Sequence, residues 1–268
     1  MIKKYKIGVI GTGMVGGPML EHFKDAIAYS QSKYAHNREI ISTADIIFIA
    51  VPTPFRKDGL GFDLTAVEDA ISVVQGEKVI VLRSTVVPGT TEDFQRKYPQ
   101  HKFLFNPEFL REKTNVVDFL NPDRQILGYT EKSNDETLIN DLFELLPNAP
   151  FKRAIPAKEA EMVKYFGNTF LAIKVIFANQ IYDLCQKLGF DYETVKEAAS
   201  ADKRIGPSHL KVDADGYRGY GGACFPKDTR ALIQFADSQG IDLKLHKMAE
   251  ELNHELTGGG LNTSLRGG

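Results

Sequence analysis

The chain is poor in cysteine and has no surplus of positive charge, and both shortages narrow its class. Only Cys185 and Cys224 occur among 268 residues, which excludes a disulfide framework and a cysteine-based structural metal site and suits a reducing cytoplasm. The formal net charge of -2 lacks the basic excess that follows a phosphate backbone. We therefore expect neither a metal nor a nucleic-acid partner.

Long apolar runs are also missing. No stretch approaches the roughly 18 uninterrupted apolar residues that a membrane helix needs, and the opening residues MIKKYKIGVIG lead into a strand pattern without a signal-peptide core. We expect a cytoplasmic protein without a membrane partner. The remaining composition, 43% hydrophobic and 25% charged, is that of a soluble globular protein with one large domain or two modest ones.

The first half has the pattern of an α/β fold. Short runs rich in Val, Ile and Phe alternate with stretches of helical period, which predicts a Rossmann-like, doubly wound parallel sheet. The expected strands are residues 6–10, 26–29, 46–51, 78–83, 102–105 and 125–128, and the clearest helices are 63–75 and 88–97.

The second half predicts an all-α domain around one long helix. Three prolines in residues 147–156 mark the boundary, so we expect a dinucleotide-binding domain over 1–152, a helical domain over 153–256, and a disordered, glycine-rich tail over 257–268. Residues 158–188 predict a helix of about 45 Å, because each residue adds 1.5 Å. Shorter helices are expected over 192–199, 227–238 and 243–256.

Apolar residues occupy more than one stripe of this long helix. Burial on two sides follows, and a homodimer formed across the helix is the economical hypothesis. A central helix within a monomeric bundle is the alternative.

A glycine loop follows the first expected strand. It reads GTGMVG over residues 11–16 and opens a helix, which is the context of a dinucleotide-binding fingerprint. Gly11 permits the tight turn, Gly13 lets the backbone approach a pyrophosphate, and Gly16 allows close packing of helix on strand. Met14 and Val15 complete the predicted cofactor loop.

The acid that usually binds the adenine ribose is absent. Ser30, Ser32 and Lys33 stand after the second expected strand, where a carboxylate would select the unphosphorylated cofactor. Two interpretations remain open: these residues bind a 2′-phosphate and favour NADP, or they are solvated and NAD binds with a weaker ribose contact.

A second glycine-rich loop carries a candidate nucleophile. GYGGACFPKD spans residues 219–228, so Cys224 precedes a helix that begins with Pro226 and Lys227. A thiolate beside a helix N-terminus and a lysine is stabilised and therefore activated. Cys185, among apolar residues of the long helix, is expected to be structural.

Together these motifs resemble the UDP-glucose/GDP-mannose dehydrogenase family, over residues 5 to about 255. Four further segments carry the resemblance: FIAVPTP at 48–54, STVVPGT at 84–90, NPEFLRE at 106–112 and EAEMVKYFGNT at 159–169.

The resemblance implies an enzyme that oxidises a sugar-nucleotide alcohol to a uronic acid with two dinucleotides, NAD being favoured. A first hydride transfer gives an aldehyde, Cys224 adds to form a thiohemiacetal, and a second transfer leaves a thioester that water hydrolyses. UDP-glucose is the expected substrate, although the sequence does not distinguish it from other UDP- or GDP-sugars.

The resemblance also implies roles for individual residues. Lys164 and Asn168 would stabilise oxyanions, Asp228 would assist proton transfer, and Glu108 would assist thioester hydrolysis. Thr85 and Glu112 would position the water and nicotinamide side. The other implied contacts are those of Phe109, Leu110, Arg204, Tyr220 and Gly221 to the substrate. Independently of the family, Thr53 follows a buried strand and is expected at the carboxyl edge of the sheet, where cofactors bind in such folds.

Spacing supports part of this assignment independently of the family. Lys164 and Asn168 lie four residues apart, so one helix face offers a cation and an amide to one oxyanion. Glu108 and Glu112 share that spacing, although Pro107 makes an extended loop equally compatible. Arg204 is as consistent with a solvated surface arginine as with a substrate contact.

The chain departs from the family in two places. The second Rossmann-like domain that usually follows is missing, which is compatible with truncation, with an open substrate site or with a partner polypeptide. Only about 16 residues separate Ser30 from Ile46, so a strand and a helix near the adenine pocket are expected to be lost.

Two other functions therefore stay open. One is a two-electron hydroxyacid or 6-phosphogluconate-type dehydrogenase without a covalent cysteine. The other is a catalytically silent dinucleotide-binding module.

Overall fold

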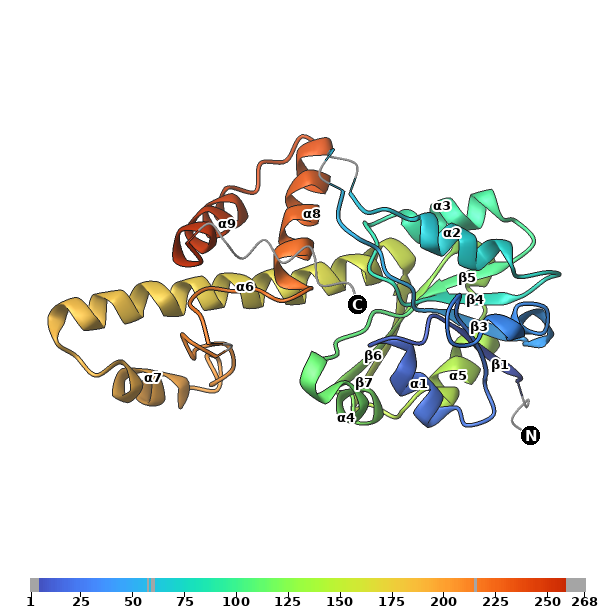
Figure 1. Ribbon diagram of the computed structural model, residues 1–268, viewed down its shortest axis with the longest axis horizontal. Helices are drawn as coiled ribbons and strands as arrows, with labels where there is room; N and C mark the ends of the chain where they lie inside the picture. Colours follow the sequence, from blue (N-terminus) through green and yellow to red (C-terminus); the bar gives the residue numbers. More distant parts are fainter. Residues whose placement is uncertain (1–4, 57, 59–60, 215, 259–268) are drawn as a thin grey trace. The chain divides into compact units, whose positions relative to one another are not determined.

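The computed structural model describes residues 5–56, 58, 61–214 and 216–258 (Figure 1). The chain forms two compact units that divide between Lys164 and Tyr165, with Gly61 joining the second unit. Within the described ranges, no helix combines the length and apolar character needed to cross a membrane.

The first unit is built on one sheet. In the described residues it has seven strands in the order β2-β1-β3-β4-β5-β6-β7. Their bounds are β1 Ile7–Ile10, β2 Ile27–Tyr29, β3 Ile46–Ile49, β4 Val79–Leu82, β5 Lys102–Phe105, β6 Arg124–Tyr129 and β7 Phe151–Pro156. The predicted doubly wound fold is confirmed, and all six predicted strands are present.

One strand pair departs from the predicted parallel sheet. β5 and β6 run antiparallel, with Leu104 opposite Tyr129 and Phe105 opposite Gly128. The helix between them, α4 (Asn115–Leu120), has only six residues and rises about 9 Å. The two strands run in opposite directions, so β6 begins at the edge of the sheet where β5 ends.

Both faces of the sheet are buried, and β3 shows why its sequence is continuously apolar. Ile46 and Phe48 enter the core on one face, whereas Ile47 and Ile49 enter the core on the other. Alternate side chains of a strand point to opposite faces, so a strand covered on both sides must be apolar throughout.

Helices from different parts of the chain cover the two faces (Figure 1). One face packs against α4, α1 (Gly16–His22) and α5 (Glu136–Leu145), which contribute Phe119, Met19 and Leu142 to its core. The other face packs against α2 (Thr65–Ser72) and α3 (Thr90–Lys97), which contribute Ile71 and Phe94.

Strand β7 was not predicted. The sequence marks residues 147–156 as the boundary between the domains, whereas residues 151–156 pair in parallel with β6 along their full length. β7 is the last strand of the sheet, and the side chains of its first three residues are exposed. An edge strand with Lys152 and Arg153 lacks the apolar run that marked the central strands. The sheet therefore continues beyond the predicted boundary at 152/153.

The link between β2 and β3 is shortened as expected. It contains only two short 3-10 turns, η1 (Ala35–Asn37) and η2 (Ile41–Thr43), instead of a strand and a helix. Ile41 is fully buried against the core, so the second turn closes this side of the sheet.

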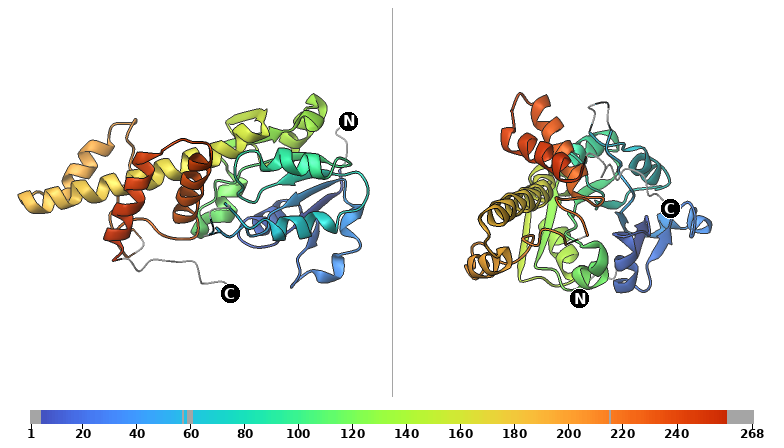
Figure 2. Two further views of the ribbon diagram at one scale, coloured as in Figure 1. Left: turned by 90° about the horizontal axis from the view of Figure 1, so that it is seen from above. Right: turned by 60° about the vertical axis from the view of Figure 1, so that its left-hand side comes forward.

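The predicted long helix is confirmed as α6 (Ala157–Leu188), which has 32 residues and continues from the first unit into the second (Figure 2). Three further helices of the second unit agree with prediction: α7 (Tyr192–Ser200), α8 (Phe225–Ser238) and α9 (Lys244–Leu256). Residues 259–268, most of the tail expected to be disordered, lie outside the described residues.

Two small apolar clusters lie among the described residues of the second unit. One joins α6 through Ala172 and Ile176 to Tyr220 and to Ala249 of α9. The other joins the end of α6 to α7 through Tyr192 and includes buried Cys185. Cys185 therefore packs as a small apolar residue, as expected.

Adjacent glycines at the start of α1 provide a test of this packing. A Cβ at Gly16 would lie 1.8 Å from the carbonyl oxygen of Gly11, whereas a Cβ at Gly17 would lie 3.6 Å from that of Thr12. We expect Gly16→Ala to lower the free energy of unfolding by about 1–3 kcal/mol. Gly17→Ala should leave it unchanged or raise it by up to about 1 kcal/mol. Urea unfolding followed by circular dichroism measures both, and equal effects would contradict the close approach.

Candidate active site and dinucleotide pocket

A cavity of about 480 Å³ lies at the carboxyl ends of β1, β2 and β3 in the first unit. This volume is within the usual range of ligand pockets. Its lining consists of Ile10, Gly11, Thr12, Gly13, Tyr29, Ser30, Gln31, Ser32, Arg38, Ala50, Val51, Pro52, Ala66, Asp69, Ala70 and Ser72. Four of the predicted cofactor residues, Gly11, Gly13, Ser30 and Ser32, are among them.

The glycine loop has the geometry that a pyrophosphate requires. Gly11 has a φ of 87°, and a Cβ there would lie 2.4 Å from the carbonyl oxygen of Ala50. A Cβ at Gly13 would meet no atom within 4 Å, so the backbone at Gly13 borders open space. The loop therefore fits a dinucleotide, with Gly11 needed for the turn and Gly13 for the approach.

The end of β2 brings a cation to this cavity that sequence reasoning missed. Arg38 donates from Nη1 to the Tyr29 hydroxyl at 3.2 Å and lines the cavity. The Lys33 ammonium instead lies 5.2 Å from the centre of the Tyr34 ring, and Lys33 is not part of the lining. Arg38 is eight residues beyond Ser30, and only the η1 turn returns it to β2, so spacing alone gave no signal.

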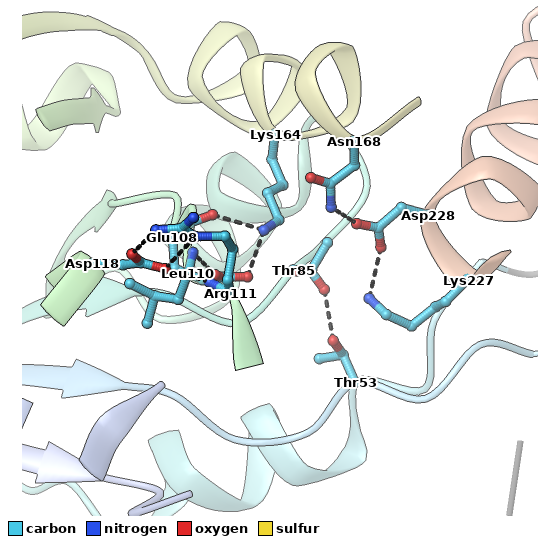
Figure 3. Close-up of polar contacts among 10 residues, drawn as sticks. All are labelled: Thr53, Thr85, Glu108, Leu110, Arg111, Asp118, Lys164, Asn168, Lys227 and Asp228. Carbon is cyan, nitrogen blue, oxygen red and sulfur yellow. Dashed lines mark hydrogen bonds and ion pairs between the residues drawn. The ribbon is translucent and has the colours of Figure 1, made fainter. Parts of the chain in front are cut away.

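Two loops at the carboxyl edge of the sheet are joined by a threonine pair (Figure 3). Thr53, which follows β3, donates from Oγ1 to the Thr85 carbonyl oxygen at 2.7 Å. Thr53 is buried, so it positions the loop that carries Thr85. Thr53, Met14 and Val15 are absent from the cavity lining, and their cofactor contacts stay predictions.

Lys164 and Glu108 form a buried ion pair within the first unit (Figure 3). Lys164 Nζ donates to Glu108 Oε1 at 2.5 Å and to the Glu108 carbonyl oxygen at 2.7 Å. The other carboxylate oxygen, Oε2, accepts from the Leu110 N–H at 2.9 Å. Lys164 and Glu108 are only 4% and 5% exposed, so each charge depends on the other for compensation.

Electrostatics keeps Glu108 ionised despite its burial. Burial opposes ionisation, but the Lys164 ammonium, the bonds from Lys164 and Leu110, and the Arg83 charge together hold the pKa of Glu108 below its ordinary value. Arg83 was not predicted as a site residue. It is fully buried after β4, and burial lowers its pKa to about 10 although Glu108 opposes that shift.

Glu161 holds the first turns of α6 against the start of α3. Its carboxylate accepts from the backbone N–H of Gly89 at 2.5 Å and of Thr91 at 2.8 Å, and from the Thr91 hydroxyl at 2.6 Å. Burial raises the pKa of Glu161 to about 7 although these donors oppose the shift. Because Lys164 follows one turn later on α6, this anchor fixes the direction from which Lys164 reaches Glu108.

In the second unit, the carboxylate of Asp228 is held on both sides (Figure 3). Asn168 Nδ2 donates to Asp228 Oδ2 at 2.6 Å, and Lys227 Nζ donates to Asp228 Oδ1 at 2.7 Å. Asp228 is fully buried in the first turn of α8, and half-buried Cys224 is the N-cap residue of that helix. The Asp228 N–H bonds the Cys224 carbonyl oxygen at 2.8 Å, so the two residues lie one turn apart.

The loop that leads to Cys224 is fixed by a residue that the sequence did not reveal. Asn253 of α9 accepts from the Tyr220 N–H at 2.7 Å and donates to the Tyr220 carbonyl oxygen at 2.9 Å. The Tyr220 hydroxyl donates to Glu250 at 2.8 Å, which directs the ring into the core of the second unit. Asn253 lay within a predicted helix and carried no motif.

The remaining predicted residues occupy more open positions. Arg204 has 89% of its side chain exposed and pairs with neighbouring Asp202, while Glu112 is exposed in η3 (Glu112–Thr114). The Phe109 ring lies 5.9 Å from the Lys164 ammonium and 3.9 Å from the Arg124 guanidinium. In the described part of the chain, no three His, Cys, Asp or Glu side chains are grouped to hold a metal ion. The substrate contacts of Phe109, Leu110, Arg204, Tyr220 and Gly221 stay predictions.

The doubly wound sheet, the glycine loop and the cavity beside it define a dinucleotide-binding α/β protein of the Rossmann type. Residues 21–146 match the model of the UDP-glucose/GDP-mannose dehydrogenase family, NAD binding domain, and residues 158–255 match that of the family's central domain. The chain belongs to the UDP-glucose/GDP-mannose dehydrogenase family, and the match supports a dinucleotide cofactor of the NAD type.

Individual relatives agree with this assignment. UDP-glucose 6-dehydrogenase YwqF of Bacillus subtilis is 39% identical over 228 residues, covering 80% of this chain and 49% of the relative. The UDP-glucose 6-dehydrogenase of Pseudomonas aeruginosa is 37% identical, with the same coverage. The chain thus spans about half the length of these curated relatives.

Solved structures extend the comparison to the fold. A UDP-glucose dehydrogenase from Pyrobaculum islandicum superposes with a TM-score of 0.81 at 31% identity, covering 95% of this chain and 69% of that one. The 3-hydroxyisobutyrate dehydrogenase of Mycobacterium tuberculosis gives a TM-score of 0.72 at 16% identity, covering 94% and 93%. The second likeness concerns the fold alone.

The buried ion pair gives a pH-dependent prediction. Because the pKa of Glu108 lies below its ordinary 4.5, its ionisation stabilises the native state above that pH, and the contribution is lost as the pH falls below it. Lys164→Met removes the charge that compensates Glu108, so we expect the free energy of unfolding to fall by about 3–5 kcal/mol at pH 7.5. In this variant burial favours the protonated form of Glu108. The difference in free energy of unfolding between the variant and the unaltered chain should therefore become smaller as the pH falls toward 5.

Urea unfolding at both pH values measures this difference. Lys158→Met is the matched control, because Lys158 is an exposed lysine of the same helix, and it should change the free energy of unfolding by less than about 0.5 kcal/mol. An equal loss for Lys164→Met at both pH values would show that the Glu108 carboxylate is not what Lys164 compensates.

Proposed function

We propose that this chain is a nucleotide-sugar 6-dehydrogenase that oxidises the C6 alcohol of UDP-glucose to a carboxylate, giving UDP-glucuronate. The observation that carries the proposal is Cys224 at the start of α8, one turn before an Asp228 carboxylate held by Asn168 and Lys227. The names of the relatives support the choice of UDP-glucose among sugar nucleotides.

The position of Cys224 suits a covalent nucleophile. The N-terminus of α8, a helix of 14 residues, favours negative charge on a thiol at its N-cap, and the Lys227 cation follows within the first turn. The cysteine is half-buried, so its sulfur is neither sealed in the core nor fully solvated. Buried Cys185 has neither feature.

The cofactor supplies one kind of chemistry, the acceptance of one hydride by each of two nicotinamide dinucleotides. Gly11 and Gly13 of the 480 Å³ cavity would hold its pyrophosphate. The tight turn at Gly11 and the open backbone at Gly13, rather than a side chain of this loop, would accommodate the pyrophosphate.

The proposed oxidation proceeds through the thiol. Loss of a hydride from C6 and a proton from its hydroxyl gives the aldehyde, and the Cys224 sulfur then bonds to C6 to form a thiohemiacetal. Loss of a second hydride and a proton leaves a thioester. Water adds to the thioester, the C–S bond breaks, and the sulfur recovers its proton as the carboxylic acid is released.

The charged groups have matching roles in this proposal. The Lys164 ammonium and the Asn168 amide, four residues apart on α6, stabilise the C6 oxyanion. Asp228 accepts protons through water, and Glu108 assists hydrolysis of the thioester. Thr85 and Glu112 position the water and the nicotinamide side.

Substitution of the nucleophile separates this proposal from its alternatives. The unaltered chain should reduce two cofactor molecules for each acid formed, and Cys224→Ser should lower that turnover by on the order of 10³-fold or more while retaining cofactor binding. Cys185→Ala is the matched control and should keep the activity. Absorbance of the reduced nicotinamide, followed with UDP-glucose, UDP-N-acetylmannosamine and GDP-mannose, measures the stoichiometry.

Other stoichiometries would refute the four-electron mechanism. One reduced cofactor per keto product, with full activity in Cys224→Ser, would indicate a two-electron dehydrogenase. Cofactor binding without reduction by any of the three sugar nucleotides would indicate a catalytically silent module.

We also propose that the chain forms a homodimer through α6. Phe170, Phe177 and Leu184 recur every seven residues and therefore share one face of this helix. Their exposed fractions are 59%, 59% and 54%. A stripe of large apolar residues left open to water is typical of a protein–protein contact.

A charge within this stripe tests the dimer. Phe177→Glu should convert the dimer to a monomer, because association would bury an unpaired carboxylate. Gln186→Glu is the matched control, since Gln186 is exposed and lies nine residues, or about two and a half turns, along α6 and so faces the opposite side. Light scattering after gel filtration gives the mass, and a monomeric unaltered chain would refute the proposal.

A further inference from the structure

The end of the dinucleotide cavity that would receive the adenine ribose has donor groups in place of the usual carboxylate. Where a carboxylate would accept bonds from the 2′- and 3′-hydroxyls of an adenine ribose, Ser30 follows the last residue of β2. Ser30, Gln31, Ser32 and Arg38 line the cavity here and bring hydroxyl, amide and guanidinium donors. This set of donors suits an anion better than a neutral diol.

This end of the cavity is directly connected to the glycine loop. The Gly11 N–H donates to the Tyr29 carbonyl oxygen at 2.9 Å, and Ser30 is the next residue after Tyr29. A dinucleotide whose pyrophosphate lies on the loop therefore places its adenine ribose beside Ser30. The Ser30 oxygen accepts from the Tyr34 N–H at 3.3 Å, which leaves its own O–H to donate to a ligand.

The η1 turn brings Arg38 back to the end of β2, where Ser30 lies. Asn37 Nδ2 donates to the Ala28 carbonyl oxygen at 2.7 Å and so holds the turn against β2. Arg38 then donates one N–H to the Tyr29 hydroxyl, and its guanidinium has four more. Within the described residues no carboxylate forms an ion pair with Arg38, although it lines a cavity. A cation so placed is available to an anionic ligand.

One acid faces the same cavity and has to be weighed. Among the described lining residues, Asp69 of α2 is the sole carboxylate, and its neighbours in that wall are Ala66, Ala70 and Ser72. These small side chains form the wall contributed by α2, whereas the cationic and hydroxyl groups belong to β2 and the segment that follows it. The residue that normally selects the ribose is the one that follows the second strand. Asp69 lies on α2 and therefore does not hold that position.

We propose that this cavity binds a dinucleotide that carries a 2′-phosphate, as NADP does, with Arg38 and Ser30 as the groups that select it. The proposal rests on the dinucleotide-binding role of the first unit and specifies its ligand, in place of the NAD expected from the family. Arg38 supplies paired N–H donors and a positive charge to the phosphate oxygens, and Ser30 adds a neutral donor.

Equilibrium binding tests the proposal without requiring turnover. Titration calorimetry of the full chain with NADPH and with NADH should show NADPH bound at least about tenfold more tightly, as a charge-assisted bond to one phosphate would provide. The fragments 2′,5′-ADP and 5′-AMP should repeat that order, because they differ only at the 2′-phosphate. Added salt should weaken the binding of NADPH more than the binding of NADH, because salt screens the attraction between charges.

Substitutions test which residues cause the preference for NADPH over NADH. Arg38→Gln should lower the affinity for NADPH by at least about tenfold and leave NADH nearly unchanged. Ser30→Asp restores a carboxylate after β2 and should reverse the preference. Lys33→Gln removes a neighbouring cation that lies outside the cavity lining and should retain the preference of the unaltered chain.

The outcomes separate this inference from the proposed function. If the unaltered chain bound NADH as tightly as NADPH, the inference would be overturned and the dehydrogenase proposal would stay intact. The same conclusion would follow if Asp69→Asn lost NADH binding while Arg38→Gln left the affinity for NADPH unchanged. If neither NADPH nor NADH bound to the unaltered chain, the proposed function itself would be refuted.

Discussion

The buried pair of Lys164 and Glu108 is the constraint on which the arrangement of polar groups in the first unit depends. Neither charge is stable at 4% and 5% exposure without the other, so the loop after β5 and the first turns of α6 have to meet. Glu161 adds a second anchor from α6 to the start of α3. The direction of the long helix is therefore set by compensated charge as well as by apolar packing.

The second unit applies the same rule to the loop before Cys224. The backbone of Tyr220 is satisfied by Asn253, and buried Asp228 is satisfied by Asn168 and Lys227. Because the Tyr220 backbone and the Asp228 carboxylate both have partners, the loop before Cys224 has a defined conformation. This arrangement presents a half-buried thiol at the start of α8.

Residues within contiguous motifs were predictable, and their supporting residues were not. The glycine loop, Lys164, Asn168, Cys224 and Asp228 carry distinctive types at distinctive spacing. Arg38, Arg83 and Asn253 act through contacts with residues that are distant in sequence or follow an irregular turn. Strand β7 was missed for a related reason, since an edge strand has no apolar run to distinguish it from a linker.

The sequence by itself determined the class of fold, the long helix, the family and the candidate nucleophile, because these depend on local periodicity and on residues that lie side by side in the chain. Only the tertiary structure decided which charges are compensated, that β6 runs antiparallel to β5, and that Arg38 rather than Lys33 lines the cavity at the end of β2. Such features depend on burial and on contacts between distant segments, and the free energy of a charged group changes with both.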